Sequence, residues 1–343
     1  MPTFPGNTRF AFTVIDDTDV ATVANVAPVY RMLEALGMRT TKTVWPLDCP
    51  GERGDYDGSQ TLEDDDYVDF IVDLRRRGFE VTWHGATMSS SQRSRTLRAL
   101  ERYRDVLGDY PRIHVNHSEN RENLYWGADR IDAPILRRIM RELGLRRAGS
   151  EGNDPGSAYW WGDLCREHIT YARNLTFDDI NLLNANPTLP YRDPARSLVP
   201  WWFSASDADN VLEFNWLLRP ENQARLEREG GVCIVATHFG KGFARKGRVH
   251  ATTYALLSQL AQRQGWFVPV GTLLDWLREK AVVGELGQRE WRRMQWRWFR
   301  DLVMRRVRGR KLGDWKAHAE LPVGTHNYNT LEIPEVRLSS RII

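Results

Sequence analysis

Cysteine is scarce in this sequence. The 343 residues include only three, Cys49, Cys165 and Cys233, which are far apart and form no CxxC pair. This spacing excludes a disulfide framework and a structural zinc cluster built from thiolates. No run of about 18 apolar residues is present, which is the length that a membrane-spanning helix needs. The start, MPTFPGNTRF, also lacks the charged and apolar stretches of a secretory signal. These absences predict a cytoplasmic protein.

The sequence also has no large excess of positive or negative charge. The 48 Lys and Arg residues nearly balance the 45 Asp and Glu residues, which leaves a net charge of +3. The overall charge therefore does not indicate a nucleic-acid partner. Basic residues are instead concentrated locally, since residues 289–311 are rich in arginine and contain only Glu290 and Asp301 as acidic residues.

Strand-like runs alternate with helix-like segments over most of the chain. The expected strands are 9–15, 40–47, 79–84, 112–117, 168–175, 211–218 and 232–239, and the expected helices are 26–37, 61–78, 90–108, 129–144, 220–229 and 251–264. Such alternation predicts an α/β protein with a parallel sheet covered by helices. Seven or eight units over about 275 residues fit a (β/α) barrel better than an open sheet. We therefore predict a barrel over residues 1–280 and a helical and extended appendage over residues 281–343.

Chemistry-bearing side chains follow several of the expected strands. Asp16 and Asp17, within VIDDTD, end the first strand, and His84, His117 and His238 end three later ones. In (β/α) barrels the carboxyl ends of the strands form the active face. Neighbouring carboxylates repel each other unless a cation offsets the repulsion. A solvated acidic turn and structural histidines remain the alternative, but the combination favours a metal site.

This ordered set of motifs resembles the polysaccharide deacetylases, the NodB-homology fold of carbohydrate esterase family four. The resemblance covers roughly residues 8–280, including the closing segment GWFVPVGTLLDWL. It implies a distorted seven-stranded barrel and a metal-dependent hydrolase that removes an acetyl or formyl group from an amino sugar. It further implies Asp16 as general base, Asp17 and His84 as metal ligands, and His238 as general acid. Zinc is the divalent metal that suits such a set best.

The sequence departs from this family at the second metal-binding motif. The family places a second histidine four residues after the first, and Met88 occupies that position here. His117 from the next strand is the expected replacement, which gives a predicted metal set of Asp17, His84 and His117. Asp19 is the other candidate for the third ligand. Without a replacement, the protein would be a non-hydrolytic barrel that binds a glycan or a partner.

The family's Arg-Pro-rich turn is also absent. The segment NHSENRENLYWGADR stands in its place, and we expect Asn116, Arg121, Tyr125 and Trp126 to orient a substrate. Lys241, in FGKGF, could contact a substrate phosphate.

Two aspartates leave further alternatives open. Asp207 and Asp209 could pair with His238, or simply face solvent in a turn. A glycoside hydrolase that uses Asp17 with Asp207 is an alternative function. The leading expectation is an N-deacylase acting on an amino-sugar glycan precursor of cell-envelope polysaccharide biosynthesis.

The basic segment 286–311 is predicted to form an amphipathic helix. Trp291, Met294, Trp298 and Leu302 lie along one side, and Trp296, Phe299, Val303 and Val307 widen this apolar stripe. Such a helix suits an anionic membrane surface, in which case the substrate would be a lipid-linked saccharide. Packing on the barrel or on a sister subunit is the alternative, and nucleic-acid binding is disfavoured.

Overall fold

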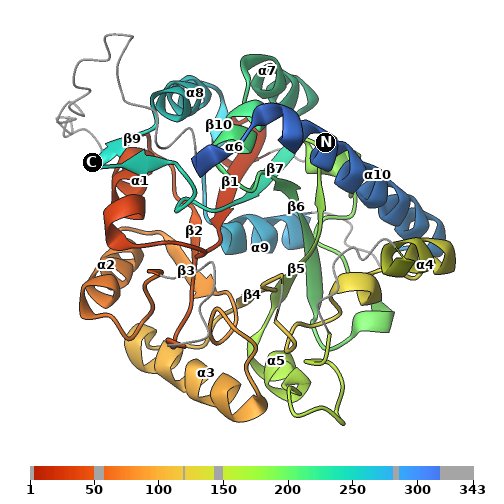
Figure 1. Ribbon diagram of the computed structural model, residues 1–343. Coiled ribbons are helices and arrows are strands. Elements are labelled where there is room, and N and C mark those ends of the chain that lie inside the picture. Colours follow the sequence, from red (N-terminus) through yellow and green to blue (C-terminus); the bar gives the residue numbers. More distant parts are fainter. Residues whose placement is uncertain (1–3, 50–57, 119, 143–149, 281–285, 317–343) are drawn as a thin grey trace.

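Seven parallel strands form a closed barrel in the computed structural model of this protein (Figure 1). The structure describes residues 4–49, 58–118, 120–142, 150–280 and 286–316. The barrel strands are β1 (Phe10–Asp16), β2 (Thr41–Val44), β3 (Glu80–Trp83), β4 (Ile113–Val115), β5 (Tyr171–Phe177), β6 (Trp201–Asp207) and β7 (Val232–Thr237). Each strand pairs with the next one, and β1 also pairs with β7, which closes the barrel. The short β10 (Gly265–Trp266) pairs with the start of β1. The predicted seven-stranded (β/α) barrel is thereby confirmed.

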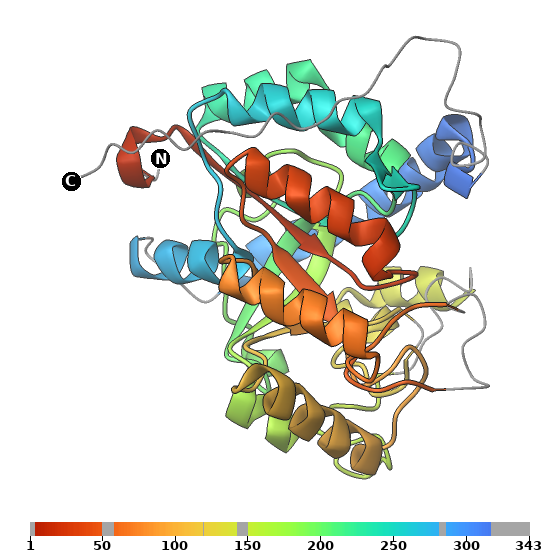
Figure 2. The same ribbon diagram turned by 90° about the vertical axis from the view of Figure 1, so that its left-hand side faces the viewer.

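Most helices surround the barrel on its outer side, whereas α9 lies behind the middle of the ring, at the amino ends of the strands (Figures 1 and 2). They are α1 (Val23–Ala35), α2 (Asp65–Arg76), α3 (Arg93–Leu107), α4 (Pro134–Glu142), α5 (Gly162–His168), α6 (Val211–Leu217), α7 (Pro220–Glu229), α8 (Ala251–Ala261), α9 (Val270–Lys280) and α10 (Gln288–Leu312). Short 3₁₀ turns occupy η1 (Pro5–Asn7), η3 (Gly127–Arg130), η4 (Leu182–Asn184) and η5 (Pro194–Arg196), and β8 (Ala244–Arg245) pairs with β9 (Arg248–Val249). No helix in these described stretches is both long and apolar enough to cross a bilayer.

Local sequence explains why the first units form as they do. Every residue of β1 is buried, because a closed barrel covers a strand on both faces and so replaces polar alternation by a continuous apolar run. The next helix, α1, begins with a capping box in which Thr22 and Asn25 satisfy each other's backbone N–H groups. These features fix the point where β1 ends, and therefore the place of the acidic residues that follow it.

The sequence prediction was wrong for the segment between β5 and α7. Residues 211–218 were expected to form a strand, but Val211–Leu217 is the helix α6, whose N-cap Asn210 accepts hydrogen bonds from the N–H groups of Leu212 and Glu213. The strand of this unit is β6, which begins with Trp201 and Trp202. The two serines and the aspartate of β6 interrupt its apolar residues, so the sequence pattern does not identify it as a strand. Both tryptophans are buried in the barrel wall.

The basic segment near the C-terminus forms the predicted helix, α10, which packs along β5. Trp291, Met294, Trp298 and Leu302 are all buried, so this stripe is covered by the barrel. A second stripe of Trp296, Val303, Met304 and Val307 stays exposed. The extended segment expected near the end of the chain lies outside the described residues.

Candidate metal centre

A polar cavity of about 210 Å³ lies at the carboxyl ends of the barrel strands. Its lining comes from β5 itself and from the ends of β1, β3, β4, β6 and β7 with the segments that follow them. The lining residues are Asp17, Asp19, His84, Asn116, His117, Ser118, Trp126, Arg173, Thr176, Asp207, Asp209, Ala236, His238 and Lys241. The strand-end residues singled out from sequence therefore largely share one cavity, as the parallel barrel requires.

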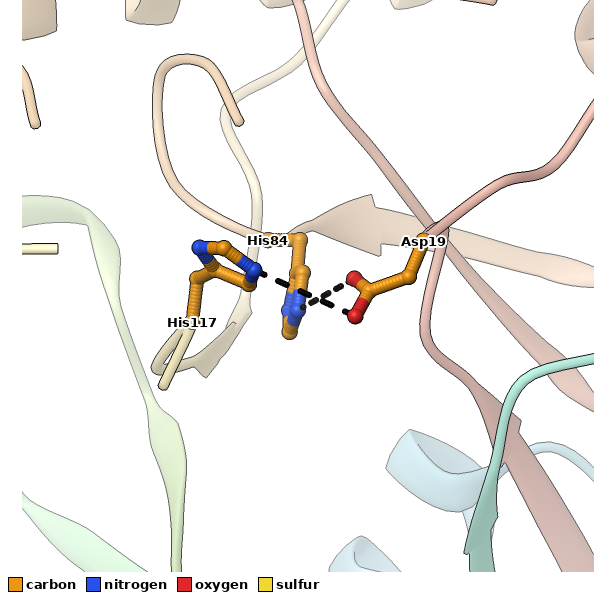
Figure 3. A group of neighbouring side chains, drawn as sticks. All are labelled: Asp19, His84 and His117. Atoms are coloured by element: carbon orange, nitrogen blue, oxygen red, sulfur yellow. Dashed lines mark ion pairs between the residues drawn. The ribbon is translucent and has the colours of Figure 1, made fainter. Parts of the chain in front are cut away.

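Asp19, His84 and His117 converge in this cavity (Figure 3). His84 Nε2 lies 3.4 Å from Asp19 Oδ1, and His117 Nε2 lies 3.9 Å from Asp19 Oδ2. One ligand atom from each residue lies within 4.8 Å of the other two. Metal–ligand bonds near 2.1 Å in a tetrahedral site place ligand atoms about 3.4 Å apart. The three side chains can therefore close on one cation with small movements.

The chemistry of this group fits a divalent metal. Two imidazoles and one carboxylate match three-ligand zinc sites that keep a fourth position open. Asp19 Oδ1 is buried, and no described residue donates a hydrogen bond to it. Because a buried acceptor without a donor costs free energy, a cation at this point would satisfy it. Burial is the strongest influence on Asp19 and raises its pKa, but His238 and His117 outweigh it and hold the pKa well below its usual range.

Asp17 occupies a different position from the one expected. Both of its oxygens accept hydrogen bonds from Arg173, at 2.9 Å and 2.5 Å, in a bidentate ion pair. Asp17 is accordingly not part of the converging group, and Asp19 takes the place expected for it. Burial raises the pKa of Asp17 most, yet Arg173, His84 and His238 together lower it below the usual value. Asp17 is therefore an ionised carboxylate at the cavity wall, with Oδ2 3.9 Å from His238 Nε2.

Asp16 does not reach the cavity, in contrast to its expected role as general base. It is fully buried, with Oδ2 3.0 Å from Lys42 Nζ, and Oδ2 also accepts a hydrogen bond of 2.9 Å from the hydroxyl of Tyr30. Oδ1 accepts the N–H of Phe239 at 2.7 Å. Asp16 and Lys42 are direct partners in the β1–β2 register, which places the ion pair between the two strands. These contacts give Asp16 a structural position beneath the site.

His238 is held at the cavity by Asp209, which follows β6, and lies beside Asp19. Its Nδ1 donates to the carbonyl oxygen of Asp209 at 2.7 Å, and its Nε2 lies 3.3 Å from Asp19 Oδ2. Lys241 donates to Asp209 Oδ1 at 2.9 Å. Burial is the largest influence on the pKa of His238 and lowers it, as does Lys241, but Asp19 and Asp209 raise it above the usual value. The expected pairing with Asp209 is present, whereas Asp207 forms an ion pair with Arg305 of α10.

Met88 packs away from the converging group. It forms a small buried apolar cluster with Trp45 and Cys49. The ring of Trp45 lies 6.0 Å from that of His84 and 5.6 Å from that of His117, between centroids. The segment after β3 thus contributes one histidine, Trp45 after β2 contributes an apolar ring beside both histidines, and the segment after β4 contributes the second histidine.

The residues expected to orient a substrate divide into two groups. Asn116, Trp126 and Lys241 line the cavity. Arg121 instead pairs with Glu151 at the surface, and Tyr125, whose ring packs against Trp202, is not among the lining residues. Tyr125 adopts a positive φ of +47° in the segment after β4.

Arg173 is a cavity residue that the sequence reasoning missed. It lies in the middle of β5, within YARNLTF, and is buried. An arginine inside a strand of otherwise apolar and neutral residues is a signal, because a buried guanidinium needs a carboxylate partner. That signal could have indicated Arg173, but the sequence does not say which aspartate it pairs with.

Comparison with known proteins supports the fold. No protein-family profile and no curated protein sequence matches the chain. Among solved structures, a Mycobacterium smegmatis protein assigned as a polysaccharide deacetylase is similar with a TM-score of 0.52 and 12% identity, over 84% of this chain and 96% of that one. A chitin deacetylase from Colletotrichum lindemuthianum is similar with a TM-score of 0.36 and 15% identity, over 78% of this chain and 88% of that one. The first of these carries the comparison, and at its identity the likeness concerns the fold alone. The chain has a polysaccharide-deacetylase-type barrel, which confirms the resemblance at the level of structure.

Proposed function

We propose that this protein is a metal-dependent hydrolase that removes an N-acyl group, acetyl or formyl, from an amino-sugar-containing glycan or its precursor. One observation carries the proposal: Asp19, His84 and His117 converge beside Asp17 and His238 in a single cavity. The deacetylase-type fold suggests this class of reaction. A fold alone does not determine a function, so the proposal depends on the residues of the cavity.

The residues have separate roles in this reaction. Asp19, His84 and His117 would hold a divalent cation, most suitably zinc, which lowers the pKa of a coordinated water to about 7 and polarises a carbonyl. Asp17, kept ionised by Arg173, accepts a proton at Oδ2. His238 donates a proton from Nε2 to the departing amine, because its Nδ1–H is already committed to the carbonyl of Asp209.

The cavity favours a small reacting group over a whole sugar chain. Its volume of about 210 Å³ is below that of drug-sized pockets, which start at roughly 300 Å³. It therefore suits an acyl group and the ring that carries it, with the rest of the glycan outside. Trp126 offers an aromatic wall whose ring is braced by Arg130, with the guanidinium carbon 3.6 Å from the ring centroid. Asn116 and Lys241 supply polar contacts.

The direct test is the zinc content of the purified protein by elemental analysis. We expect about one zinc per chain in the wild type and loss of that zinc in His84→Ala and in His117→Ala. His168→Ala is the matched control, because His168 stacks on Tyr110 with centroids 3.8 Å apart and is not part of the converging group. Chelation should then abolish acetate release from an N-acetylated chito-oligosaccharide, and added zinc should restore it.

The same experiment separates the alternatives. A wild-type protein that stays folded and binds no zinc after reconstitution would support the non-hydrolytic barrel. Hydrolysis that survives chelation would support a glycoside hydrolase. The latter requires one carboxyl group with a raised pKa as acid, but Asp17 and Asp207 are both ion-paired, with Arg173 and Arg305 respectively.

We further propose that the exposed face of α10 contacts an anionic lipid surface, which would bring the cavity to a lipid-linked saccharide. Trp296, Val303, Met304 and Val307 are 44–55% exposed on this face. Among the described residues no ion pair involves Arg289, Arg292, Arg293 or Arg306 of the same helix. An apolar stripe flanked by arginines matches interfacial helices. A second copy of the chain is disfavoured, since it would bring arginines against arginines.

Vesicle sedimentation tests this contact. The wild type should sediment with phosphatidylglycerol vesicles and much less with phosphatidylcholine vesicles, and the paired change Trp296→Glu and Val303→Glu should lower binding about tenfold or more. Leu97→Glu on α3, a similarly exposed apolar residue, is the control and should leave binding unchanged. Equal binding by the wild type and the paired variant would rule the contact out, as would self-association through this face.

A further inference from the structure

Asn120 lies directly behind the second histidine of the converging group. His117 Nδ1 is 3.0 Å from Asn120 Oδ1, and Asn120 is buried. A metal-binding histidine commonly donates its remote N–H to a neighbouring acceptor, which fixes the tautomer and the orientation of the ring. The contact therefore matters only if the Asn120 oxygen, and not its nitrogen, faces His117.

The surroundings of Asn120 determine the orientation of its amide. Nδ2 donates toward three acceptors: the carbonyl oxygens of Thr87 and Ser89, each at 3.1 Å, and Glu122 Oε1 at 2.9 Å. An oxygen at that position would face three other oxygens, which excludes the flipped amide. Oδ1 consequently accepts the N–H at His117 Nδ1. The lone pair of His117 then lies on Nε2, the atom that faces Asp19.

Glu122 holds the Asn120 amide from the far side. Its Oε2 accepts the N–H of Ser91 at 2.9 Å while Oε1 accepts from Asn120. Both carboxylate oxygens are thereby used, and the side chain is buried. The loop after β3 and the loop after β4 are thus joined by one hydrogen-bonded chain that ends on His117.

His84 and His117 differ in the hydrogen bonding of their Nδ1 atoms. His84 Nδ1 is buried with no hydrogen-bond partner among the described residues, so its hydrogen bonds do not select a tautomer. The loop that carries Met88 gives no second ligand, but its carbonyl groups at Thr87 and Ser89 hold the residue that orients the ligand from the next strand. The loop after β3, which carries Met88, in this way supports the histidine that follows β4.

We propose that Asn120, supported by Glu122, is a positioning residue that keeps His117 in the Nδ1–H tautomer and so sets the affinity of the site for its cation. This inference rests on the proposed function for the cation, but the tautomer itself belongs to the metal-free protein. It can be measured without any metal or substrate.

Two measurements test the role of Asn120. In the metal-free protein, ¹⁵N spectra of labelled histidine should show His117 as Nδ1–H in the wild type and a substantial shift toward Nε2–H in Asn120→Ala. The zinc Kd, measured by competition with a chelator, should rise about 10- to 100-fold in Asn120→Ala. Asn186→Ala is the control, because Asn186 is equally buried but bonds to Ser204 outside the cavity. It should change neither the tautomer nor the zinc Kd.

The outcomes separate the positioning role of Asn120 from the binding of a metal by the site. An unchanged tautomer, or a zinc Kd within about twofold of the wild type, would overturn the positioning role while leaving the metal site intact. A wild type that binds no zinc but shows the tautomer change would remove the proposed function and retain the positioning of His117. A loss of zinc in Asn186→Ala as large as that in Asn120→Ala would assign the effect to general destabilisation and also overturn the role.

Discussion

Replacing Lys42 with Met should lower the free energy of unfolding by about 3–5 kcal/mol, and the melting temperature by roughly 4–7 °C. Lys42 and Asp16 are both inaccessible to solvent, and their charged atoms are 3.0 Å apart. Burial is the largest influence on both pKa values and favours the neutral forms, but for Lys42 the attraction of Asp16 outweighs it and raises the pKa. Removing the ammonium group leaves a buried carboxylate without its cation. Urea unfolding followed by circular dichroism measures the loss.

A second substitution separates the loss of the pair from the loss of a side chain. Asp16→Asn combined with Lys42→Met removes both charges, and the amide can still accept the N–H of Phe239 and donate to the hydroxyl of Tyr30. We expect this double variant to recover most of the stability, since an uncharged pair in a buried site is often no less stable than an ion pair. A single Lys42→Met variant as stable as the wild type would contradict the burial of this pair.

The position of this ion pair explains how a structural group supports the site. Asp16 bonds to the backbone of Phe239, which directly follows His238, and the hydroxyl of Thr43 donates to the carbonyl of Asp16. The ends of β1, β2 and β7 are thereby tied together below the cavity. Asp17 and Asp19 start from β1, and His238 starts from β7, so the buried pair fixes the distance between the groups that would share the chemistry.

The sequence predicts the barrel and the location of its site because both follow from local patterns. Buried runs such as VCIVAT mark strands, and the carboxyl ends of parallel strands must share one face. His84, His117 and His238 therefore come to one cavity as expected. The α6 segment could not be assigned in this way, because VLEFNWL is apolar enough for a strand and its helix depends on the Asn210 cap.

The roles of the three aspartates could not be read from the sequence. Asp16, Asp17 and Asp19 lie within four residues of one another, and their roles depend on which cation each one meets. Asp16 forms an ion pair with Lys42, Asp17 forms one with Arg173, and Asp19 lies beside the histidines. Lys42 lies in β2 and Arg173 lies in β5. The sequence pattern of a strand does not show which residues its side chains contact across the barrel. Asp17 was accordingly expected as a ligand, and Asp19 only as the alternative to His117 for the third position.

A matched pair of substitutions should separate the roles of these two aspartates. Asp17→Asn should retain about one zinc per chain and lower kcat for acetate release by about 10²- to 10⁴-fold, because it removes a proton acceptor and keeps an oxygen for Arg173. Asp19→Asn should instead raise the zinc Kd at least tenfold, since a neutral amide is a weaker ligand than a carboxylate. Elemental analysis and initial rates on an N-acetylated chito-oligosaccharide measure the two effects on the same preparations.

The two variants are informative because they exchange the same groups two residues apart. Each replaces one carboxylate by an amide of equal size in the same buried wall. Asp17→Asn also removes the counter-ion of the buried Arg173, so urea unfolding of both variants is measured beside zinc content and rate. Zinc lost from Asp17→Asn and kept by Asp19→Asn would reverse the assignment and make Asp17 the ligand, at the cost of its pairing with Arg173. Zinc kept by both, with activity lost only in Asp17→Asn, would require a metal held by the histidines alone. Only the predicted pattern, in which Asp19 controls the metal and Asp17 controls the rate, agrees with the carboxylate that faces two imidazoles and the carboxylate that faces a guanidinium.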